Sequence, residues 1–483
     1  MKRIVLLFVL LVYVQVLRAQ EENSVDPSME EASAVRVIDS HLCHFKKPLQ
    51  DPTDEDDDQY CDCDVHNTPM GLPEVQIDCR KHQLADGFWQ EYEQLPQGTI
   101  RLDLSQTGLT VVPRLSGENL RYLNIGHNQI TTIPDKVFTN VSLLEELDLS
   151  SNRIETLTTD ALAGLSKLTR IDLSGNLIRS IEVNAFSNAL HLKQLTLSNN
   201  TLGTFFIRTD LYLRLGVTNR LAILEMERCN LTDINLSSGV GLETARLGYN
   251  PLQQLTNLPK QLAHLDISGT PIRSLSAKFL PHLLHLVTLE LKDMPILYTL
   301  EEYALYGLPR LSNLNLQGSR NLSSIHPHVF GQNVDRGETV TKLERLTLTG
   351  TNIRTLNSTL QAAFEKMRRL DMRGAPLRCD CQLRWLRELP NLQTLGICVK
   401  PNAVRGLTFG MVESHQFECR AEQFWIYTVF NVLLAILLIV LLSIGIVMIA
   451  RAIRPKPHVQ LRKVGASSPY ARVTIEPNRA EVL

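Results

Sequence analysis

Apolar residues recur in one fixed pattern through the middle of the chain. Four successive stretches show it most clearly: LRYLNIGHNQITTI, LEELDLSSNRIETL, LTRIDLSGNLIRSI and LKQLTLSNNTLGTF, which begin at residues 120, 144, 168 and 192. They share the form L-x-x-L-x-L-x-x-N-x-L, in which leucines alternate with polar residues. This alternation predicts a short β-strand with one buried face, followed by a turn that contains the Asn.

We count twelve copies over residues 99–378, using the second apolar position of each as its anchor. A single copy cannot bury its own leucines, so the copies are expected to stack and to form one parallel sheet. The anchors are Leu102, Leu123, Leu147, Ile171, Leu195, Leu224, Ala245, Leu265, Leu289, Leu314, Leu346 and Leu370.

The Asn position is expected to bond buried backbone groups of the turn. Five copies have Asn there: Asn128, Asn152, Asn176, Asn200 and Asn250. Cys229 takes the place in a sixth copy. The other six residues are Thr107, Thr270, Met294, Ser319, Thr351 and Ala375. Met294 and Ala375 cannot make the bonds of an amide, so we expect the ladder of turn bonds to be less regular there.

The repeated pattern resembles the extracellular leucine-rich-repeat family, whose template it follows over residues 99–378. The resemblance implies an α/β fold, a solenoid shaped as a curved horseshoe with a concave parallel sheet, in which strand exceeds helix. It also implies a surface for binding proteins. Before Leu346 the segment HVFGQNVDRGETVTK interrupts the spacing and is expected to loop out.

Eight of the nine cysteines lie at the two ends of the repeats. Four come before them and four after, and Cys229 is alone inside. The end cysteines are Cys43, Cys61, Cys63, Cys79, Cys379, Cys381, Cys398 and Cys419. Zinc sites usually space their cysteines as C-x₂₋₄-C and redox sites as C-x-x-C, whereas both ends here have C-x-C, which favours disulfides.

Both cysteine sets resemble caps of the same family, one over residues 43–98 and one over residues 379–420. By that resemblance, the rear pairs are Cys379–Cys398 and Cys381–Cys419, and the front pairs are Cys43–Cys63 and Cys61–Cys79. Spacing alone allows three pairings in each cap. Cys229 is expected to be a buried free thiol.

The two ends of the chain indicate a membrane protein. Residues 1–19 are typical of a signal peptide, with residues 20–42 as an arm after it. Residues 424–450 carry no charge and are long enough to cross a bilayer. Basic residues from Arg451 onward predict a cytoplasmic tail at 451–483, and therefore a single-pass type I protein of the plasma membrane with an extracellular N-terminus. That compartment is oxidising, as disulfides require.

Binding is the expected activity, because the sequence has no recognised catalytic motif and no cofactor is predicted. The chain is 44% hydrophobic and 21% charged, with a net charge of −2, and its middle is acidic, which argues against a nucleic-acid partner. The closest histidine pair, His326 and His328, is interpreted as an exposed loop, so no metal site is predicted.

The residue after each anchor is expected to form a central exposed column on the concave face. These residues are Asp103, Asn124, Asp148, Asp172, Thr196, Glu225, Arg246, Asp266, Glu290, Asn315, Thr347 and Asp371. Acidic residues are common at this position in this kind of repeat, so they do not by themselves indicate a ligand-binding site. Aromatic residues and Arg are enriched in binding hot spots. We therefore predict a ligand site around Tyr122, Ile223, Glu225, Arg246 and Tyr249.

Other surface features are predicted from short motifs. Six N-x-[ST] sequons are candidate N-glycosylation sites: Asn140, Asn199, Asn230, Asn235, Asn321 and Asn357. Tyr60 follows an acidic run and is a candidate for sulfation, with a plain solvated loop as the alternative. The C-terminal EVL loosely resembles a peptide that binds a PDZ domain in the cytoplasm.

These features together predict a cell-surface protein that binds an extracellular or cell-surface protein ligand. The segment after the span is too short for a kinase or Toll-type domain, so adhesion, homophilic or otherwise, and co-receptor activity are expected. Two alternatives stay open: innate-immune recognition of a microbial glycan or glycolipid, and a structural surface tether.

Overall fold

The computed structural model describes residues 43–44, 61–67, 73–80, 94–203, 209–255, 257–280, 282–331, 343–417 and 420–453. The chain divides into two compact units, residues 1–418 and 419–483, which are described separately. The expected signal peptide, the N-terminal arm, the expected cytoplasmic tail after residue 453 and most of the expected loop before Leu346 lie outside the described residues.

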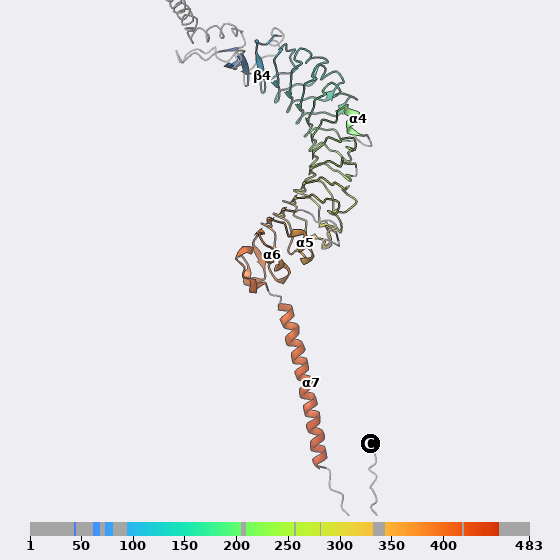
Figure 1. Cartoon of the computed structure of the whole chain (residues 1–483), viewed down its shortest axis with the longest axis vertical. Helices are drawn as coiled ribbons and strands as arrows, with labels where there is room; N and C mark the ends of the chain where they lie inside the picture. Colours follow the sequence, from blue (N-terminus) through green and yellow to red (C-terminus); the bar gives the residue numbers. More distant parts are fainter. Residues whose placement is uncertain are drawn as a thin grey trace, which may run out of the picture. The chain divides into compact units, whose positions relative to one another are not determined.

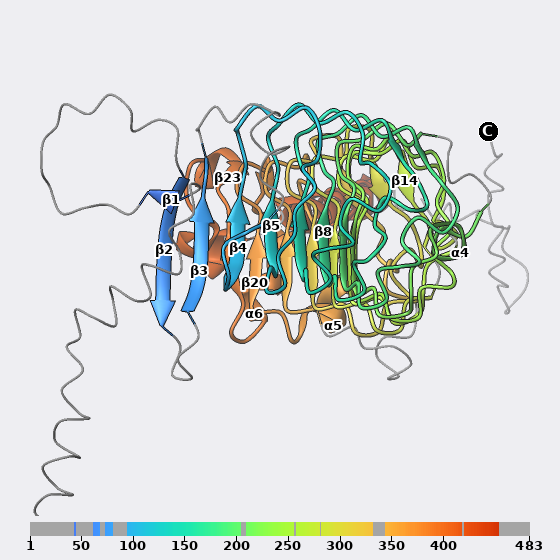
Figure 2. The same ribbon diagram turned by 90° about the horizontal axis from the view of Figure 1, so that it is seen from above.

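Twelve short parallel strands form the body of the first unit, one for each predicted copy. They line the inner side of an arc (Figure 1), and Figure 2 shows the first of them side by side. The strands are β4 (Thr99–Asp103), β5 (Tyr122–Asn124), β6 (Glu146–Asp148), β8 (Arg170–Asp172), β10 (Gln194–Thr196), β11 (Ile223–Glu225), β12 (Thr244–Arg246), β13 (His264–Asp266), β15 (Thr288–Glu290), β17 (Asn313–Asn315), β19 (Arg345–Thr347) and β20 (Arg369–Asp371).

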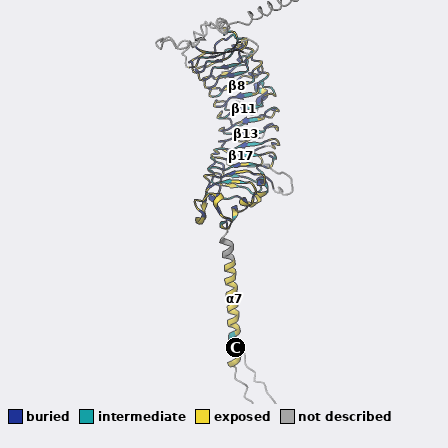
Figure 3. Cartoon of the chain, turned by 60° about the vertical axis from the view of Figure 1, so that its left-hand side comes forward, coloured by how far each residue is buried: buried dark blue, intermediate teal, exposed yellow. Residues whose placement is uncertain are grey.

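The twelve anchors are paired with one another in an unbroken register from Leu102 to Leu370. Each anchor and the apolar residue two positions after it are buried; Leu147 and Leu149 are 1% and 0% exposed. One stripe of buried apolar residues therefore runs through the twelve strands, and the burial colours in Figure 3 show buried residues recurring along the repeats. The predicted parallel-sheet solenoid is confirmed.

Both ends of the sheet are extended by strands of the cysteine-rich segments. At the front, β1 (Cys43–His44), β2 (Cys61–Asn67) and β3 (Pro73–Asp78) continue the sheet; β2 and β3 are antiparallel, and β3 is parallel to β4. At the rear, β22 (Gln393–Leu395) adds to β20, while β21 (Leu377–Arg378) pairs with β23 (Cys398–Lys400).

Disulfides join these end segments. The structure has the bonds Cys61–Cys79 and Cys379–Cys398, two of the four that the family resemblance implies. Cys63 and Cys381 are also disulfide-bonded, whereas the side chains of Cys43 and Cys419 lie outside the described residues. Cys229 is a buried free thiol, and burial raises its pKa to about 11.

The returning side of the repeats is made of short elements. Two small parallel sheets lie there: β7 (Thr156–Leu157) with β9 (Ser180–Ile181), and β14 (Ser274–Leu275), β16 (Thr299–Leu300) and β18 (Ser324–Ile325). The helices are α4 (Leu211–Leu215), α5 (Gln361–Phe364) and α6 (Trp385–Glu388), with 3₁₀ turns η3 (Ser358–Leu360), η4 (Cys381–Leu383), η5 (Asn402–Val404), η6 (Phe409–Met411) and η7 (Ser414–Gln416). Helix α4 lies in the copy between Leu195 and Leu224, which is longer than the neighbouring copies. Asp210 caps the N-terminus of this helix.

A ladder of buried amides follows the strands through the first half of the solenoid. The side-chain nitrogen of Asn176 donates to the carbonyls of Leu173, at 3.0 Å, and Leu149, at 2.9 Å, so it bonds its own copy and the preceding one. Its Oδ1 accepts the N–H of Ile154 at 3.1 Å. The other four asparagines bond in the same way, and the Cys229 thiol donates to the Leu197 carbonyl at 3.1 Å.

Hydroxyl groups replace this ladder in the second half. The hydroxyls of Thr270 and Thr351 each donate to the carbonyl three residues before them in their own copy, and the Thr270 hydroxyl also lies 3.6 Å from the sulfur of Met294 in the next copy. At Met294, the backbone N–H donates to the hydroxyl of Ser319 at 3.2 Å. The ladder of amide bonds is therefore interrupted near Met294, as expected, although β15, β17, β19 and β20 keep their register. The buried leucines fix that register, so the turn residue is not needed for it.

The described part of the second unit is one helix, α7 (Arg420–Ile453). Its 28 residues from Ile426 to Ile453 are long and apolar enough to cross a membrane, and none of this stretch is buried inside the protein. Such a helix rises roughly 42 Å, against about 30 Å for a bilayer core. Ser443 donates to the Val440 carbonyl within the helix at 2.7 Å, so its hydroxyl is bonded locally.

Candidate functional site

The register brings the twelve residues after the anchors into one row across the inner face. This placement agrees with the prediction, but the predicted exposure does not. Of the twelve, only Arg246 is exposed, while Thr196 and Asp371 are buried and the others are half-buried. Neighbouring strands are about 4.8 Å apart, so each side chain is partly covered by those beside it.

The five predicted ligand residues lie in three different rows. Glu225 and Arg246 are neighbours in the row after the anchors. Tyr122 and Ile223 lie in the row before the anchors, four strands apart in the order of the sheet. Tyr249 is not on a strand at all, but in the turn after β12, where it is 37% exposed. The structure therefore brings Glu225 and Arg246 together with the neighbourhood of Tyr249, and leaves Tyr122 apart.

A second regular row was not predicted from the sequence. The fourth residue after every anchor has a positive φ, between 52° and 76°. We call these residues the left-handed row: Gln106, His127, Ser151, Gly175, Asn199, Arg228, Tyr249, Gly269, Asp293, Gly318, Gly350 and Gly374. Glycine enters this region without strain, whereas other residues cost roughly 1–2 kcal/mol. Seven of the twelve positions nevertheless hold a side chain.

Tyr249 is the centre of a contact network along the left-handed row. The guanidinium of Arg228 lies 4.0 Å from the centre of the Tyr249 ring, a cation–π arrangement. On the other side, the Tyr249 hydroxyl donates to Asp293 at 3.1 Å, two copies further on. The copy between them has Gly269, and a Cβ there would be 2.3 Å from the ring. The glycine therefore lets the ring reach Asp293.

Charged side chains of the strands lie beside this network. Arg246 forms an ion pair with Glu225. Lys292 lies 3.4 Å from Glu290 and 4.0 Å from Asp266. Burial lowers the pKa of Lys292, but the two carboxylates more than offset this, so the pKa is raised overall. Basic and acidic groups thus alternate over four neighbouring strands.

Glu227 is a carboxyl of this region whose ionised form is disfavoured by its surroundings. Its burial, followed by the charges of Asp266 and Glu225, raises its pKa. A carboxyl whose pKa is raised in the folded state destabilises the fold when it is ionised, and the penalty disappears as the pH falls and both states become protonated. Glu227 is therefore expected to destabilise the protein at neutral pH.

We expect Glu227→Gln to stabilise the protein at pH 7 by less than about 1 kcal/mol, the usual size of such surface charge effects. The gain should shrink as the pH falls through the carboxyl range. Urea unfolding at several pH values measures it. The exposed carboxyl of Glu243 supplies the matched control, Glu243→Gln, and a gain that grows toward acid would contradict the assignment.

Two hollows in the described part of the solenoid can be compared with small-molecule sites. One, of about 200 Å³, lies on the inner face among Arg101, Tyr122, Glu146 and Arg170, where Arg101 lies 5.0 Å from the centre of the Tyr122 ring. It is smaller than the roughly 300–1,000 Å³ of most small-molecule sites. The other, of about 360 Å³, is on the returning side beside Tyr303. The inner face therefore offers a broad polar surface more than a deep pocket.

Among the sequons, Asn140, Asn199, Asn230, Asn321 and Asn357 are exposed and Asn235 is half-buried. Asn199 precedes Arg228 in the left-handed row, so a glycan on it would border the Tyr249 network. The side-chain nitrogen of Asn321 donates to the Pro295 carbonyl at 2.6 Å. Tyr60 and the C-terminal EVL lie outside the described residues.

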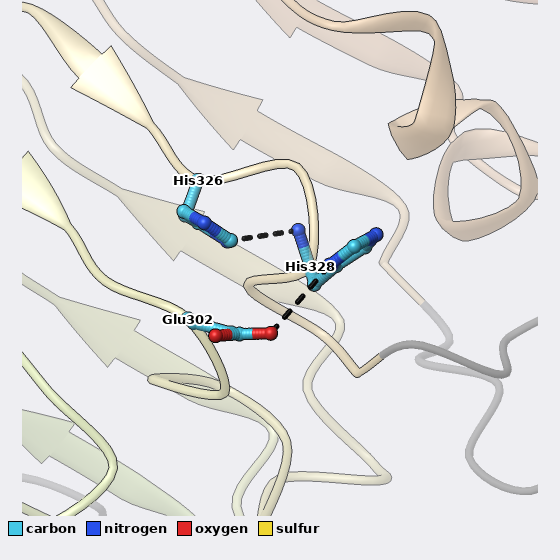
Figure 4. Close-up of side chains that lie close together, drawn as sticks. All are labelled: Glu302, His326 and His328. Carbon is cyan, nitrogen blue, oxygen red and sulfur yellow. Dashed lines mark hydrogen bonds and ion pairs between the residues drawn. The ribbon is translucent and has the colours of Figure 1, made fainter.

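The histidine pair lies in the loop after β18, as expected, but it is less exposed than expected. His326 and His328 are half-buried, and Glu302 from the preceding copy lies beside them (Figure 4). Sequence inspection missed this cluster because Glu302 lies 24 residues before His326.

Comparisons with known proteins support the leucine-rich-repeat interpretation. The family model described as leucine rich repeat matches residues 118–178. The chain is similar to leucine-rich repeat and fibronectin type-III domain-containing protein 4 of Rattus norvegicus and of Mus musculus. Each is 30% identical over 122 residues, which cover 23% of this chain and 18% of the relative. The chain thus spans less than a fifth of the length of these curated relatives.

Solved structures with a similar fold come from varied proteins. An internalin of Listeria monocytogenes strain 4b F2365 has 17% identity and a TM-score of 0.41, covering 65% of this chain and 83% of that chain. The repeat domain of FLRT2, in an octameric complex with Latrophilin 3 and Unc5D, has 18% identity and a TM-score of 0.38, covering 74% and 98%. With TM-scores below 0.5, these likenesses carry no argument about this chain.

Proposed function

We propose that this leucine-rich-repeat chain is a single-pass type I protein of the plasma membrane that binds an extracellular protein ligand. Residues 43–98 and 379–420 act as disulfide-bonded caps of the repeats at 99–378, and α7 anchors them in the membrane. Two observations support the location: disulfides at both ends of the solenoid suit an oxidising compartment, and Arg451 follows the apolar stretch of α7.

The observation that carries the proposal is the network of Arg228, Tyr249 and Asp293. All three have the left-handed backbone, which costs free energy in each case. An exposed tyrosine held by partners on both sides is a preorganised contact residue, because its ring loses little freedom when a ligand binds. Tyrosine and arginine are also the residues that most often dominate protein interfaces.

The ligand surface we propose consists of this network together with Glu225, Arg246 and Ile223. It combines an aromatic residue, an aliphatic residue and charges of both signs on rigid strands. A protein ligand fits such a broad surface, and the protein acts as an adhesion molecule or a co-receptor. A PDZ-type partner for the C-terminal EVL is part of the same proposal.

Mixing two cell populations tests this function. Labelled cells that display the full chain are mixed with differently labelled cells that lack it. Clusters of displaying cells alone would indicate homophilic adhesion, and mixed clusters would indicate a partner on the other cells. We expect one of these two results, and we expect Arg246→Glu to abolish it at equal surface expression.

A control variant separates binding from expression. Arg310→Glu changes the same charge between β16 and β17, away from the proposed surface, and should leave clustering unchanged. If no clusters form and the full chain also captures no extracellular protein, a plain surface tether becomes the better description.

A further inference from the structure

Glu302, His326 and His328 form a compact cluster on the returning side of the solenoid, away from the proposed ligand surface (Figure 4). Each offers one ligand atom, and the three atoms all lie within 4.8 Å of one another. The Nδ1 atom of His328 is 3.6 Å from Oε1 of Glu302. No other group of this kind occurs among the described residues.

The backbone that carries the cluster is held at several points. Strands β16 and β18 are paired, with Leu300 opposite Ile325. The N–H of His326 then donates to the Leu300 carbonyl at 2.9 Å, and the N–H of Tyr303 donates to the His328 carbonyl at 3.0 Å. The two histidines and the glutamate are therefore fixed relative to one another by the stacking of two adjacent copies.

Pro327 adds rigidity between the two histidines. Its ring fixes its own φ angle and it has no N–H, so the His-Pro-His segment has few conformations. Its carbonyl accepts a hydrogen bond from the Thr359 hydroxyl at 3.3 Å, which ties the segment to the next copy. Preorganised ligands lose little conformational entropy when a metal binds.

The donor set matches a borderline transition ion. Two imidazole nitrogens and one carboxylate oxygen are ligands that Zn²⁺ takes in sites with three protein ligands and one open position. Side chains of His328 and Glu302 are 39% and 41% exposed, so a metal ion can reach them and a water can complete the coordination.

Metal binding at Nδ1 of His326 requires one existing hydrogen bond to break. Nδ1 of His326 accepts the N–H of His328 at 3.2 Å, which leaves the proton of the neutral ring on Nε2. A metal bound at Nδ1 replaces this single neutral hydrogen bond. Nδ1 of His326 already points to the segment that holds His328, so the ring needs little movement.

We propose that Glu302, His326 and His328 bind one divalent transition-metal ion of the Zn²⁺ class, with a solvent molecule at the open position. The site joins two neighbouring copies, so the ion adds a cross-link between them. It does not depend on the ligand surface proposed above.

The test is a titration of the full chain in detergent micelles with Zn²⁺, followed by calorimetry, and with Co²⁺, followed by its visible absorption. We expect one equivalent of Zn²⁺ to bind and a Co²⁺ spectrum typical of fewer than six ligands. Binding should be lost in His326→Ala/His328→Ala and weakened about tenfold in Glu302→Gln. The metal should also raise the unfolding midpoint of the native chain but not that of the double variant.

His415 and Glu413 provide a matched control, because they form a histidine–glutamate pair at 3.1 Å without a second histidine. His415→Ala should leave the stoichiometry and the affinity unchanged. Circular dichroism of each variant checks that the repeats stay folded. If the double variant is folded and binds Zn²⁺ as the native chain does, or if the native chain binds none, the proposal is wrong.

Discussion

Asn176→Ala is expected to destabilise the solenoid by about 3–4 kcal/mol, because it removes three buried hydrogen bonds at once. The Ile154 N–H loses its side-chain partner and stays buried, which alone costs roughly 1–3 kcal/mol. The carbonyls of Leu149 and Leu173 lose less, since each also accepts from another asparagine of the ladder. Urea unfolding followed by circular dichroism measures the total.

Thr351→Ala is the matched control for this change. The Thr351 hydroxyl occupies the same position of a later copy but makes one bond, to the Leu348 carbonyl at 2.8 Å. Its removal should cost about 1 kcal/mol. Hydrogen exchange should also show faster opening of β6, β8 and β10 in Asn176→Ala. Equal losses in the two variants would mean that the amide ladder does not stabilise the first half more than the hydroxyls stabilise the second.

Tyr249→Gly is expected to weaken ligand binding at least about tenfold while leaving the free energy of unfolding nearly unchanged. A central tyrosine of an interface usually contributes more than 1.4 kcal/mol, which is tenfold in affinity. For stability, glycine relieves roughly 1–2 kcal/mol of left-handed strain. It also removes the cation–π contact with Arg228 and the hydrogen bond to Asp293, at about 0.5–1 and 1 kcal/mol. These terms nearly cancel.

Two further variants sharpen the test of Tyr249. Gly269→Ala leaves the tyrosine in place but puts a Cβ where its ring lies, so it should also weaken binding. Tyr298→Ala removes a 50% exposed tyrosine between β15 and β16, away from the inner face, and should have no effect. For all three variants, binding is measured by cell clustering or capture of the ligand, and stability is measured by urea unfolding. Full binding by a folded Tyr249→Gly variant would remove Tyr249 from the ligand surface.

The repeat pattern was sufficient to predict the strands and their register. Leucines at fixed spacing must all enter one core, so Leu102 and its eleven counterparts could only align as they do. The strand β22 was not predicted, because the residue that pairs with the last anchor, Thr394, is not apolar. Its pairing depends on the cap that follows. The exposure of the row after the anchors was also misjudged, since the burial of Thr196 and Asp371 depends on the side chains of neighbouring strands.

The candidate site was predictable only in part. Residue type pointed to Arg246, Glu225 and Tyr249, and the structure places these in two adjacent copies. The bond from Tyr249 to Asp293 spans 44 residues and passes over Gly269, so no local pattern shows it. The backbone of the left-handed row was equally hidden, because side chains as different as those of Arg228 and Gly350 occupy the same turn. Glycine at five of the twelve positions was the signal that could have revealed it.

In the left-handed row, the backbone conformation is independent of the side chain that it presents. Every copy makes the same turn whether its residue is a glycine, an arginine or a tyrosine, so the backbone does not depend on what it presents. Substitutions can therefore change this row one position at a time, because the stability of the large leucine core offsets the backbone strain of each. A descendant that exchanged Gly318 or Gly350 for an aromatic residue would acquire a new contact without having to fold in a new way.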